Sequence, residues 1–117
     1  MISWLTLMSV VFALSATARS KLDGRYVATA YTTPGITASG EQAKRRLVAA
    51  DPTVLPLGSE IRITGAGPYS GEYEVGDTGR KIKGRMLDIY IANDAEAKRF
   101  GKKRVSVEVI KLAQSSK

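Results

Sequence analysis

The sequence predicts a small, mainly β protein: a barrel of six short strands with one short helix near its C-terminus. Glycine and proline cut the chain into short segments, with 11 glycines and 4 prolines among 117 residues. Most apolar segments between them alternate with a period of two, which is typical of half-buried strands. Only one segment carries helical capping signals. Repeated βαβ units would need more helices, so a closed or nearly closed barrel is the natural packing.

The first four strands are predicted from apolar alternation and from the turn residues that separate them. They are expected, in order, at Gly24–Thr32, Leu47–Ala50, Glu60–Thr64 and Glu72–Val75. Residues 33–40 form a loop in which Pro34-Gly35 predicts a turn, and the polar residues 41–46 are either a loop or a short helical turn. Residues 65–71 are a further turn region.

The C-terminal third contains the clearest strand and the one predicted helix. In residues 86–91 every second position is apolar, which places one face of the strand in the core. Asn93-Asp94 offers an N-cap for a helix over residues 95–100, and Gly101 is a natural stop. Residues 104–112, with valine at alternate positions, close the domain as the sixth strand.

Two aspartates stand on either side of a glycine-bounded basic loop, and the second interrupts an apolar strand. Asp77 precedes this loop and Asp88 follows it, inside the strand at residues 86–91. Aspartate is depleted in strands and costly to bury without partners. A carboxyl group held in a partly dry cleft is a common way to make a catalytic acid. The structural alternative is that backbone donors satisfy Asp88.

Composition excludes several kinds of chemistry. The chain has no cysteine and no histidine, so it can form neither a disulfide nor a thiolate or imidazole metal site. Nucleophilic systems that need a histidine base are excluded as well. The acidic residues do not cluster at ligand spacing, so no metal and no cofactor are expected. Any acid–base chemistry must come from Asp, Glu, Tyr or Lys.

The N-terminal segment predicts secretion. Residues 1–18 carry no charged side chain, residues 4–14 are mostly apolar, and small residues in an Ala-x-Ala pattern end at Ala18. This is typical of a signal peptide cleaved after Ala18. The alternative is a retained membrane anchor, but the apolar run is shorter than the ~20 residues that a spanning helix needs. We therefore expect a signal peptide at 1–18 and one barrel domain at 24–113, secreted or periplasmic, without stable membrane insertion.

The formal net charge of +7 falls entirely after residue 18. A basic secreted protein is attracted to polyanions such as cell-wall polymers and acidic lipid surfaces. Nucleic acid is not an expected partner, because the basic residues are scattered and no aromatic-rich strand accompanies them. Solubility alone is the other explanation of the charge.

Several candidate residues also fit other interpretations. Asp77–Gly79 has the Asp-Thr-Gly triplet of retroviral-type aspartic proteases. However, Arg80-Lys81 follows it, and two cations would favour ionisation of both acids in a shared-proton pair. Asp51 precedes a proline, which is common in turns. Lys83 fits an exposed loop, and Tyr31 fits ordinary packing.

Short motifs across residues 27–112 together resemble the three-aspartate, or 3D, domain. They are Val27–Tyr31, Thr37–Gly40, Val48–Pro52, Leu55–Gly58, Asp77–Gly79, Ile82–Gly84, Leu87–Tyr90 and Phe100–Gly101. No single motif is specific, but the ordered set with its three aspartates is. The resemblance implies a double-psi β-barrel, in the superfamily of rare lipoprotein A and expansins. The chain departs from the family where Arg80 and Lys81 follow the Asp-Thr-Gly triplet.

The resemblance also implies an activity, because the 3D domain is the catalytic module of membrane-bound lytic transglycosylase A. Such enzymes cleave peptidoglycan between N-acetylmuramic acid and N-acetylglucosamine and leave 1,6-anhydro products. The implied site has Asp88 as principal acid beside Asp77, with substrate contacts from Asp51, Tyr31, Thr37 and Lys83. We expect a cell-wall-associated monomer that binds peptidoglycan glycan strands. The alternatives are a non-catalytic, expansin-like wall-binding module and a hydrolase on the same scaffold.

Overall fold

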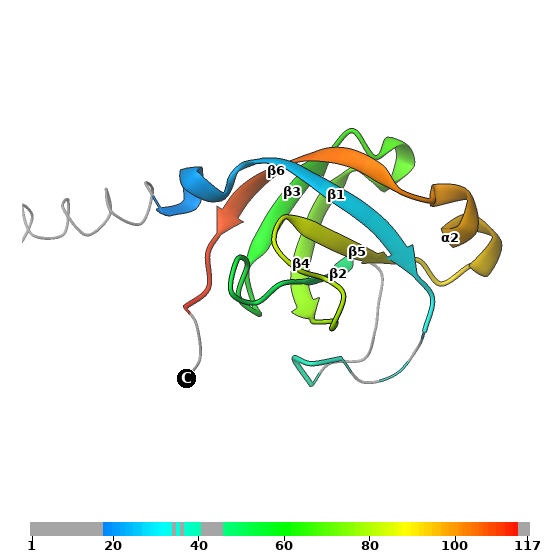
Figure 1. Cartoon of the computed structure of the whole chain (residues 1–117), viewed down its shortest axis with the longest axis horizontal. Coiled ribbons are helices and arrows are strands. Elements are labelled where there is room, and N and C mark those ends of the chain that lie inside the picture. Colours follow the sequence, from blue (N-terminus) through cyan, green and yellow to red (C-terminus); the bar gives the residue numbers. More distant parts are fainter. Residues whose placement is uncertain (1–17, 34, 36, 41–45, 115–117) are drawn as a thin grey trace, which may run out of the picture.

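The computed structural model is a closed barrel of six strands (Figure 1). It describes residues 18–33, 35, 37–40 and 46–114. The strands are β1 (Gly24–Tyr31), β2 (Leu47–Ala50), β3 (Glu60–Thr64), β4 (Gly71–Asp77), β5 (Met86–Tyr90) and β6 (Lys103–Lys111). A 3₁₀ turn, η1 (Gly67–Tyr69), lies between β3 and β4, and the helix α2 (Asp94–Phe100) lies between β5 and β6. The predicted six-stranded barrel with one short C-terminal helix is therefore confirmed.

The strand order around the barrel is β1-β5-β2-β4-β3-β6, so most neighbours in space are not neighbours in sequence. Two of the pairs, β1 with β5 and β2 with β4, are parallel, and the other four are antiparallel. Parallel strands need crossing connections rather than hairpins. The closed order of six strands brings β5 between β1 and β2.

Alternation explains which side of each strand lies inside. On β5 the apolar Leu87 and Ile89 are fully buried, whereas Met86, Asp88 and Tyr90 point outward and are half-buried. The same period of two buries Val105, Val107 and Val109 of β6 and Ile61 and Ile63 of β3. These residues belong to one core, which also takes Phe100 from α2. The core therefore fixes the outward direction of Asp88.

The predicted elements hold with small shifts at their ends. β4 is longer than predicted and runs to Asp77, so this aspartate ends a strand. The predicted strand at 86–91 loses its last residue, but the Ile91 backbone N–H still donates to Tyr31 O at 2.9 Å. The Asn93 side chain caps α2 by accepting from the Glu96 N–H at 2.9 Å, as its sequence position predicts.

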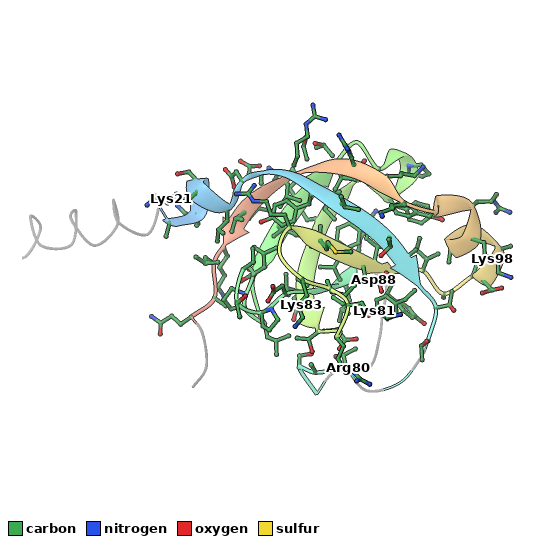
Figure 2. All side chains as sticks on the ribbon, in the orientation of Figure 1. Lys21, Arg80, Lys81, Lys83, Asp88 and Lys98 are labelled. Carbon is green, nitrogen blue, oxygen red and sulfur yellow. The ribbon has the colours of Figure 1, made fainter. Side chains whose placement is uncertain are left out.

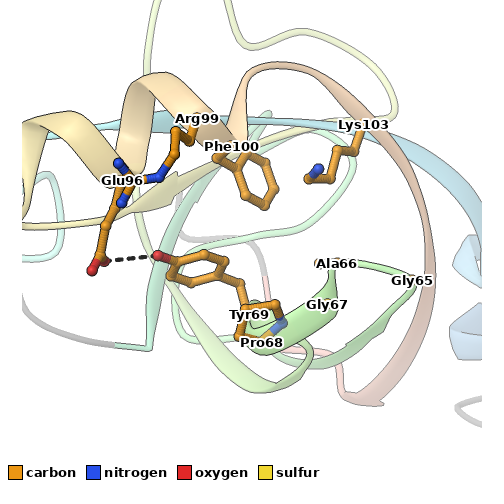
Figure 3. Close-up of a pocket in the computed structure, with 9 residues that line it drawn as sticks. All are labelled: Gly65, Ala66, Gly67, Pro68, Tyr69, Glu96, Arg99, Phe100 and Lys103. Carbon is orange, nitrogen blue, oxygen red and sulfur yellow. Dashed lines mark hydrogen bonds between the residues drawn. The ribbon is translucent and has the colours of Figure 1, made fainter.

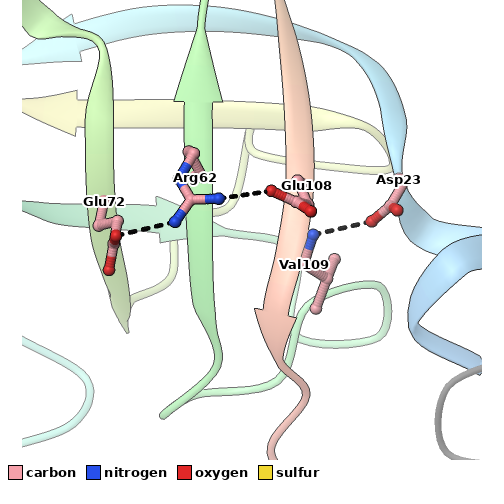
Figure 4. A network of polar contacts seen from close by, with 5 residues as sticks. All are labelled: Asp23, Arg62, Glu72, Glu108 and Val109. Carbon is pink, nitrogen blue, oxygen red and sulfur yellow. Dashed lines mark hydrogen bonds and ion pairs between the residues drawn. The ribbon is translucent and has the colours of Figure 1, made fainter.

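An exposed row of ion pairs joins β4, β3 and β6 (Figure 4). The Arg62 guanidinium on β3 donates to Glu72 on β4 at 3.0 Å and to Glu108 on β6 at 2.7 Å. Both carboxylates stand directly across from Arg62 in the two ladders. Cross-strand pairs of opposite charge favour one register over its neighbours.

The N-terminal part of the described chain is helical at residues 18–22. Asp23 ties this segment to the barrel by accepting from the Val109 N–H at 2.7 Å (Figure 4). Within the described ranges, no helix is long and apolar enough to span a membrane. Residues 1–17 and the polar residues 41–45 lie outside the described part, so the predicted signal peptide remains a prediction.

Candidate active site

The barrel presents Asp88 on the outer face of β5, with a hydroxyl beside it. Thr29 of β1 is its direct partner in the parallel ladder, and the Thr29 hydroxyl donates to Asp88 Oδ1 at 2.9 Å. The same hydroxyl also lies 3.3 Å from the Leu87 carbonyl oxygen. Burial raises the pKa of Asp88, the Thr29 hydrogen bond acts against this, and the negative charge of Asp77 raises it further. Desolvation is the largest of the three causes, so this carboxyl holds its proton more tightly than a free aspartate.

Asp77 ends β4 and is held by three donors. Its Oδ1 accepts from the backbone N–H groups of Ala38 at 3.0 Å and Thr78 at 2.9 Å. Its Oδ2 lies 3.4 Å from the Tyr31 hydroxyl, which donates to it. Burial and the Asp77 charge raise the pKa of Tyr31, so the phenol stays protonated and acts as a donor. These contacts give the Asp77 carboxylate a fixed position.

β2 runs between the two aspartates and sets their spacing. Ala49 is the ladder partner of Asp88 on β5 and of Asp77 on β4. Adjacent strands lie ~4.8 Å apart, so the two aspartate backbones are roughly 9–10 Å apart. Ala49 is almost fully buried, and its methyl group adds little bulk between the acids. A pair of carboxyl groups separated by one strand can act on two parts of one ligand.

A tyrosine pair borders the acids. Tyr31 and Tyr90 are partners in the parallel β1–β5 ladder, and their rings meet edge to face with centroids 5.5 Å apart. The predicted contact residue Tyr31 is therefore next to both Asp77 and Tyr90. Such aromatic pairs fix ring positions and provide an apolar surface next to polar groups.

Asp51 directly follows β2, and its two carboxylate oxygens accept hydrogen bonds from two different loops. Its Oδ1 accepts from the Thr53 N–H at 3.0 Å and from the Thr53 hydroxyl at 2.7 Å. Its Oδ2 accepts from the Gly84 N–H at 2.8 Å. The Gly84 N–H and the two Thr53 donors hold the pKa of Asp51 below its usual range, and the Lys83 charge contributes in the same direction. Asp51 therefore anchors the loop that carries Lys83 to the end of β2.

The basic loop between β4 and β5 lies at the edge of the site. Arg80, Lys81 and Lys83 are exposed, and in the view of Figure 2 they fall with Asp88 in the lower half of the barrel. The other predicted contact residue, Thr37, is buried in the loop after β1. Its hydroxyl lies 3.0 Å from the Ser39 hydroxyl, and the next residue along the chain donates to Asp77.

Sequence reasoning missed two partners of the acids. Thr29 contacts Asp88 and the Ala38 N–H contacts Asp77, and both come from parts of the chain more than 35 positions away. The parallel pairing of β1 with β5 brings Thr29 beside Asp88, and no local sequence pattern predicts that pairing. Over the described residues, no group of three or more acidic residues lies close enough to hold a metal ion.

The 3D domain family matches residues 46–113, more than half of the chain. The chain belongs to the 3D domain family. The cell wall-binding protein YocH of Bacillus subtilis is 37% identical over 92 residues, which cover 71% of this chain and 31% of YocH. The chain spans less than half the length of each of the curated relatives it matches.

Solved structures share the fold. The crystal structure of MltA from E. coli superimposes with a TM-score of 0.57 at 24% identity, over 69% of this chain and 28% of MltA. E. coli MltA with bound chitohexaose gives a TM-score of 0.56 at 24% identity, over 70% of this chain and 29% of that one. At this level of identity the similarity establishes the barrel fold, as the resemblance of the motifs predicts.

Proposed function

We propose that this domain is a peptidoglycan lytic transglycosylase with Asp88 as its acid and base. One observation carries the proposal: a half-buried carboxyl group on the outer barrel face, whose pKa is raised by burial and by Asp77. An acid catalyst must be protonated before reaction, and both causes favour the protonated form of Asp88. The fold shared with E. coli MltA supports the same reaction class.

The proposed step needs no water and no enzymic nucleophile. Asp88 gives its proton to the glycosidic oxygen between N-acetylmuramic acid and N-acetylglucosamine as the bond from the anomeric carbon breaks. The O6 hydroxyl of the same muramic unit attacks that carbon and closes the 1,6-anhydro ring. Its proton goes to the Asp88 carboxylate, which restores the acid. An ordinary glycosidase uses a second carboxylate to activate water or to attack, and this route replaces that group by O6.

Thr29 suits both protonation states of Asp88. When the carboxyl is protonated, it can donate to the Thr29 oxygen while the Thr29 hydroxyl donates to Leu87 O, 3.3 Å away. When Asp88 is ionised, the Thr29 hydroxyl donates to it instead, at 2.9 Å. One rotation of a hydroxyl group thus follows the movement of the proton during the reaction. Thr29 is a positioning residue in this scheme.

The other predicted residues have supporting roles in the proposal. The charge of Asp77 adds to the larger effect of burial in raising the pKa of Asp88, and Tyr31 holds Asp77. Asp51 positions the loop of Lys83, whose exposed ammonium group can meet a substrate carbonyl or carboxylate. Thr37 lies in the loop whose next backbone N–H holds Asp77. No role for a metal or cofactor is part of this scheme.

Digestion of purified sacculi tests the activity. The mature chain is expected to release muropeptides with 1,6-anhydro ends, and Asp88→Asn is expected to keep the fold and release none. Mass spectrometry separates anhydro ends from the ordinary reducing ends that a hydrolase would leave. Asp94→Asn is a matched control, because Asp94 is an exposed acid at the start of α2. Unchanged anhydro product from Asp88→Asn would remove Asp88 from its role.

The second candidate is a non-catalytic wall-binding module. The name of the relative YocH, a cell wall-binding protein, favours it, since YocH shares 37% identity with this chain over 92 residues. This candidate predicts sedimentation of the chain with sacculi and no soluble product. Both candidates place a monomeric, secreted or periplasmic protein at the cell wall, with a signal peptide at 1–18 and peptidoglycan strands as partner.

A further inference from the structure

A groove of about 560 Å³ adjoins the end of β5, outside the acid pair. Its walls come from Arg46 before β2, Tyr69 and Tyr73 around η1 and β4, Tyr90 of β5, and Asn93 and Glu96 at the start of α2. We call this the tyrosine groove. Its volume falls within the ~300–1,000 Å³ of typical small-molecule sites, which combine apolar walls with a few polar groups.

The tyrosine groove meets the acid site at Tyr90, which lines the groove and lies on the same outward face of β5 as Asp88. Asp88 and Tyr90 both point outward from β5 and are two residues apart, which is ~6.6 Å along a strand. The Tyr90 ring also packs against Tyr31, whose hydroxyl donates to Asp77. A polymer whose scissile bond lies at Asp88 therefore reaches the groove within about one monomer length.

Arg46 places a cation on the wall of the groove in a strained backbone conformation. Its φ of 67° lies in the left-handed region, which is unfavourable for a residue with a side chain. The guanidinium lies over the Tyr73 ring, 5.2 Å from its centroid, and Nη1 donates to Ser70 O at 3.1 Å. These contacts orient a group with five N–H donors in a planar fork that matches a carboxylate. A strained residue that carries such a group suggests a binding role.

Tyr69 gives the groove a fixed aromatic wall. Its hydroxyl donates to Glu96 Oε2 at 2.8 Å, and its ring meets the Phe100 ring edge to face at 5.6 Å (Figure 3). Figure 3 shows a second pocket, which shares Tyr69 and Glu96 with the tyrosine groove and is also lined by Lys103. A fixed ring offers a flat apolar surface at low entropic cost, next to polar groups. Sugar rings present a matching surface, apolar on the face and polar at the edge.

We propose that the tyrosine groove binds the sugar units next to the cleaved bond and that Arg46 holds a muramic carboxylate. This rests on the proposed function for the class of substrate. The aromatic wall accepts any N-acetylhexosamine ring, whereas Arg46 distinguishes the acidic muramyl strand from a neutral N-acetylglucosamine polymer. Arg46 is then a specificity residue.

Binding by the full mature chain tests this directly, with Asp88→Asn as the parent so that the ligands survive. Calorimetry would compare peptide-free muramyl strands, which expose the lactyl carboxylate, with neutral N-acetylglucosamine hexamers. Arg46→Gln is expected to weaken muramyl binding about tenfold or more, the usual loss for a charge-assisted hydrogen bond, and to leave hexamer binding unchanged. Arg46→Lys keeps the charge but loses the planar fork of donors, so its affinity for muramyl strands is expected to lie between those of Arg46→Gln and the parent.

Two further variants and one control separate the aromatic wall from the charge. Tyr69→Ala is expected to weaken both ligands equally. Tyr69→Phe keeps the ring and loses only the hydrogen bond to Glu96, so it is expected to weaken both ligands less than Tyr69→Ala does. Arg104→Gln removes the same charge from an exposed site on β6, outside the groove, and is expected to have no effect. Unfolding temperatures of all variants would be recorded to confirm the fold.

Each outcome bears on one claim. Equal losses for both ligands in Arg46→Gln would overturn the carboxylate contact, and parent-like binding by Tyr69→Ala would overturn the groove. The groove proposal would also be overturned if the Asp88→Asn parent bound no muramyl strand. If the variants behave as expected but the unsubstituted chain releases no anhydro product from sacculi, the groove stands and the proposed function fails. If it releases that product and Tyr69→Ala does so with the same KM, the function stands and the groove fails.

Discussion

A methyl group at position 76 would test how the barrel packs the strand that carries Asp77. Gly76 is buried on β4, directly before Asp77. A Cβ at Gly76 would lie 2.5 Å from Leu47 Cδ1 and 2.9 Å from Leu47 Cγ. Leu47 is fully buried, so its side chain has little room to move away. The backbone of Gly76 is also held in place, because its carbonyl accepts from the Ser39 N–H at 3.1 Å.

The size of the effect follows from two opposing contributions. Overpacking a filled site costs about 1–3 kcal/mol. Replacing glycine by alanine within a strand returns about 0.5–1 kcal/mol of backbone entropy. A contact as short as 2.5 Å favours the upper part of the first range, so Gly76→Ala is expected to lower the free energy of unfolding by about 1–2 kcal/mol. For a domain of this size that lowers Tm by about 4–16 °C.

Thermal unfolding followed by circular dichroism measures this loss, and a double-mutant cycle assigns it to Leu47. Leu47→Ala removes the atoms that the new methyl group would meet, at its own cost of about 2–5 kcal/mol. In that background Gly76→Ala is expected to be neutral or slightly stabilising, since only the entropic gain remains. An equal fall in Tm in both backgrounds would refute the packing argument.

Three further predictions concern the electrostatics of the site. Asp77→Asn removes a charge that raises the pKa of Asp88. In a sacculus assay, the pH above which activity is lost should therefore be lower for this variant. An unchanged pH profile would contradict the coupling. Thr29→Val removes a hydrogen bond that lowers the same pKa, so the pH above which activity is lost should be higher, whereas Thr29→Ser should leave it unchanged. Asp51→Asn removes an acceptor of the Gly84 N–H. The pKa of Asp51 is lowered in the folded state, so its ionised form stabilises the fold at pH values above the unfolded-state pKa of about 3.9. The difference in unfolding free energy between the unsubstituted chain and Asp51→Asn, measured by urea unfolding, should therefore be largest near neutrality and shrink as the pH falls below about 4. A difference that does not change with pH would contradict this role of Asp51.

The strands could be predicted because each is bounded by turn residues and alternates strictly. The segment 60–64 is predicted to the residue, since Ile61 and Ile63 can be buried only on one face of a strand. α2 is predicted over residues 95–100 and begins one residue earlier, at Asp94, because Asn93 caps it through its own side chain and Gly101 ends it with a positive φ of 63°. These signals are local, so they need no knowledge of the rest of the barrel.

The site could be predicted only in part, because its partners depend on which strands pair. Asp88 is visible as a polar residue in an apolar strand. The ladder that places Thr29 beside it joins segments 59 positions apart, and no pattern within either segment specifies the other. Local signals predicted a closed or nearly closed barrel, and only the order of motifs shared with the 3D family predicted which barrel fold it is and which residues form its site.

The basic loop after Asp77, in which Arg80 and Lys81 depart from the family pattern, does not lower the pKa of Asp88. A cation next to Asp88 would lower its pKa and weaken it as a proton donor. In the described chain, the contributions at Asp88 come from burial, Thr29 and Asp77. The charge of Lys83 acts instead on Asp51, which is already ionised and held by backbone donors. Arg80, Lys81 and Lys83 are exposed, so the loop can attract an anionic polymer, while burial and the charge of Asp77 raise the pKa of Asp88.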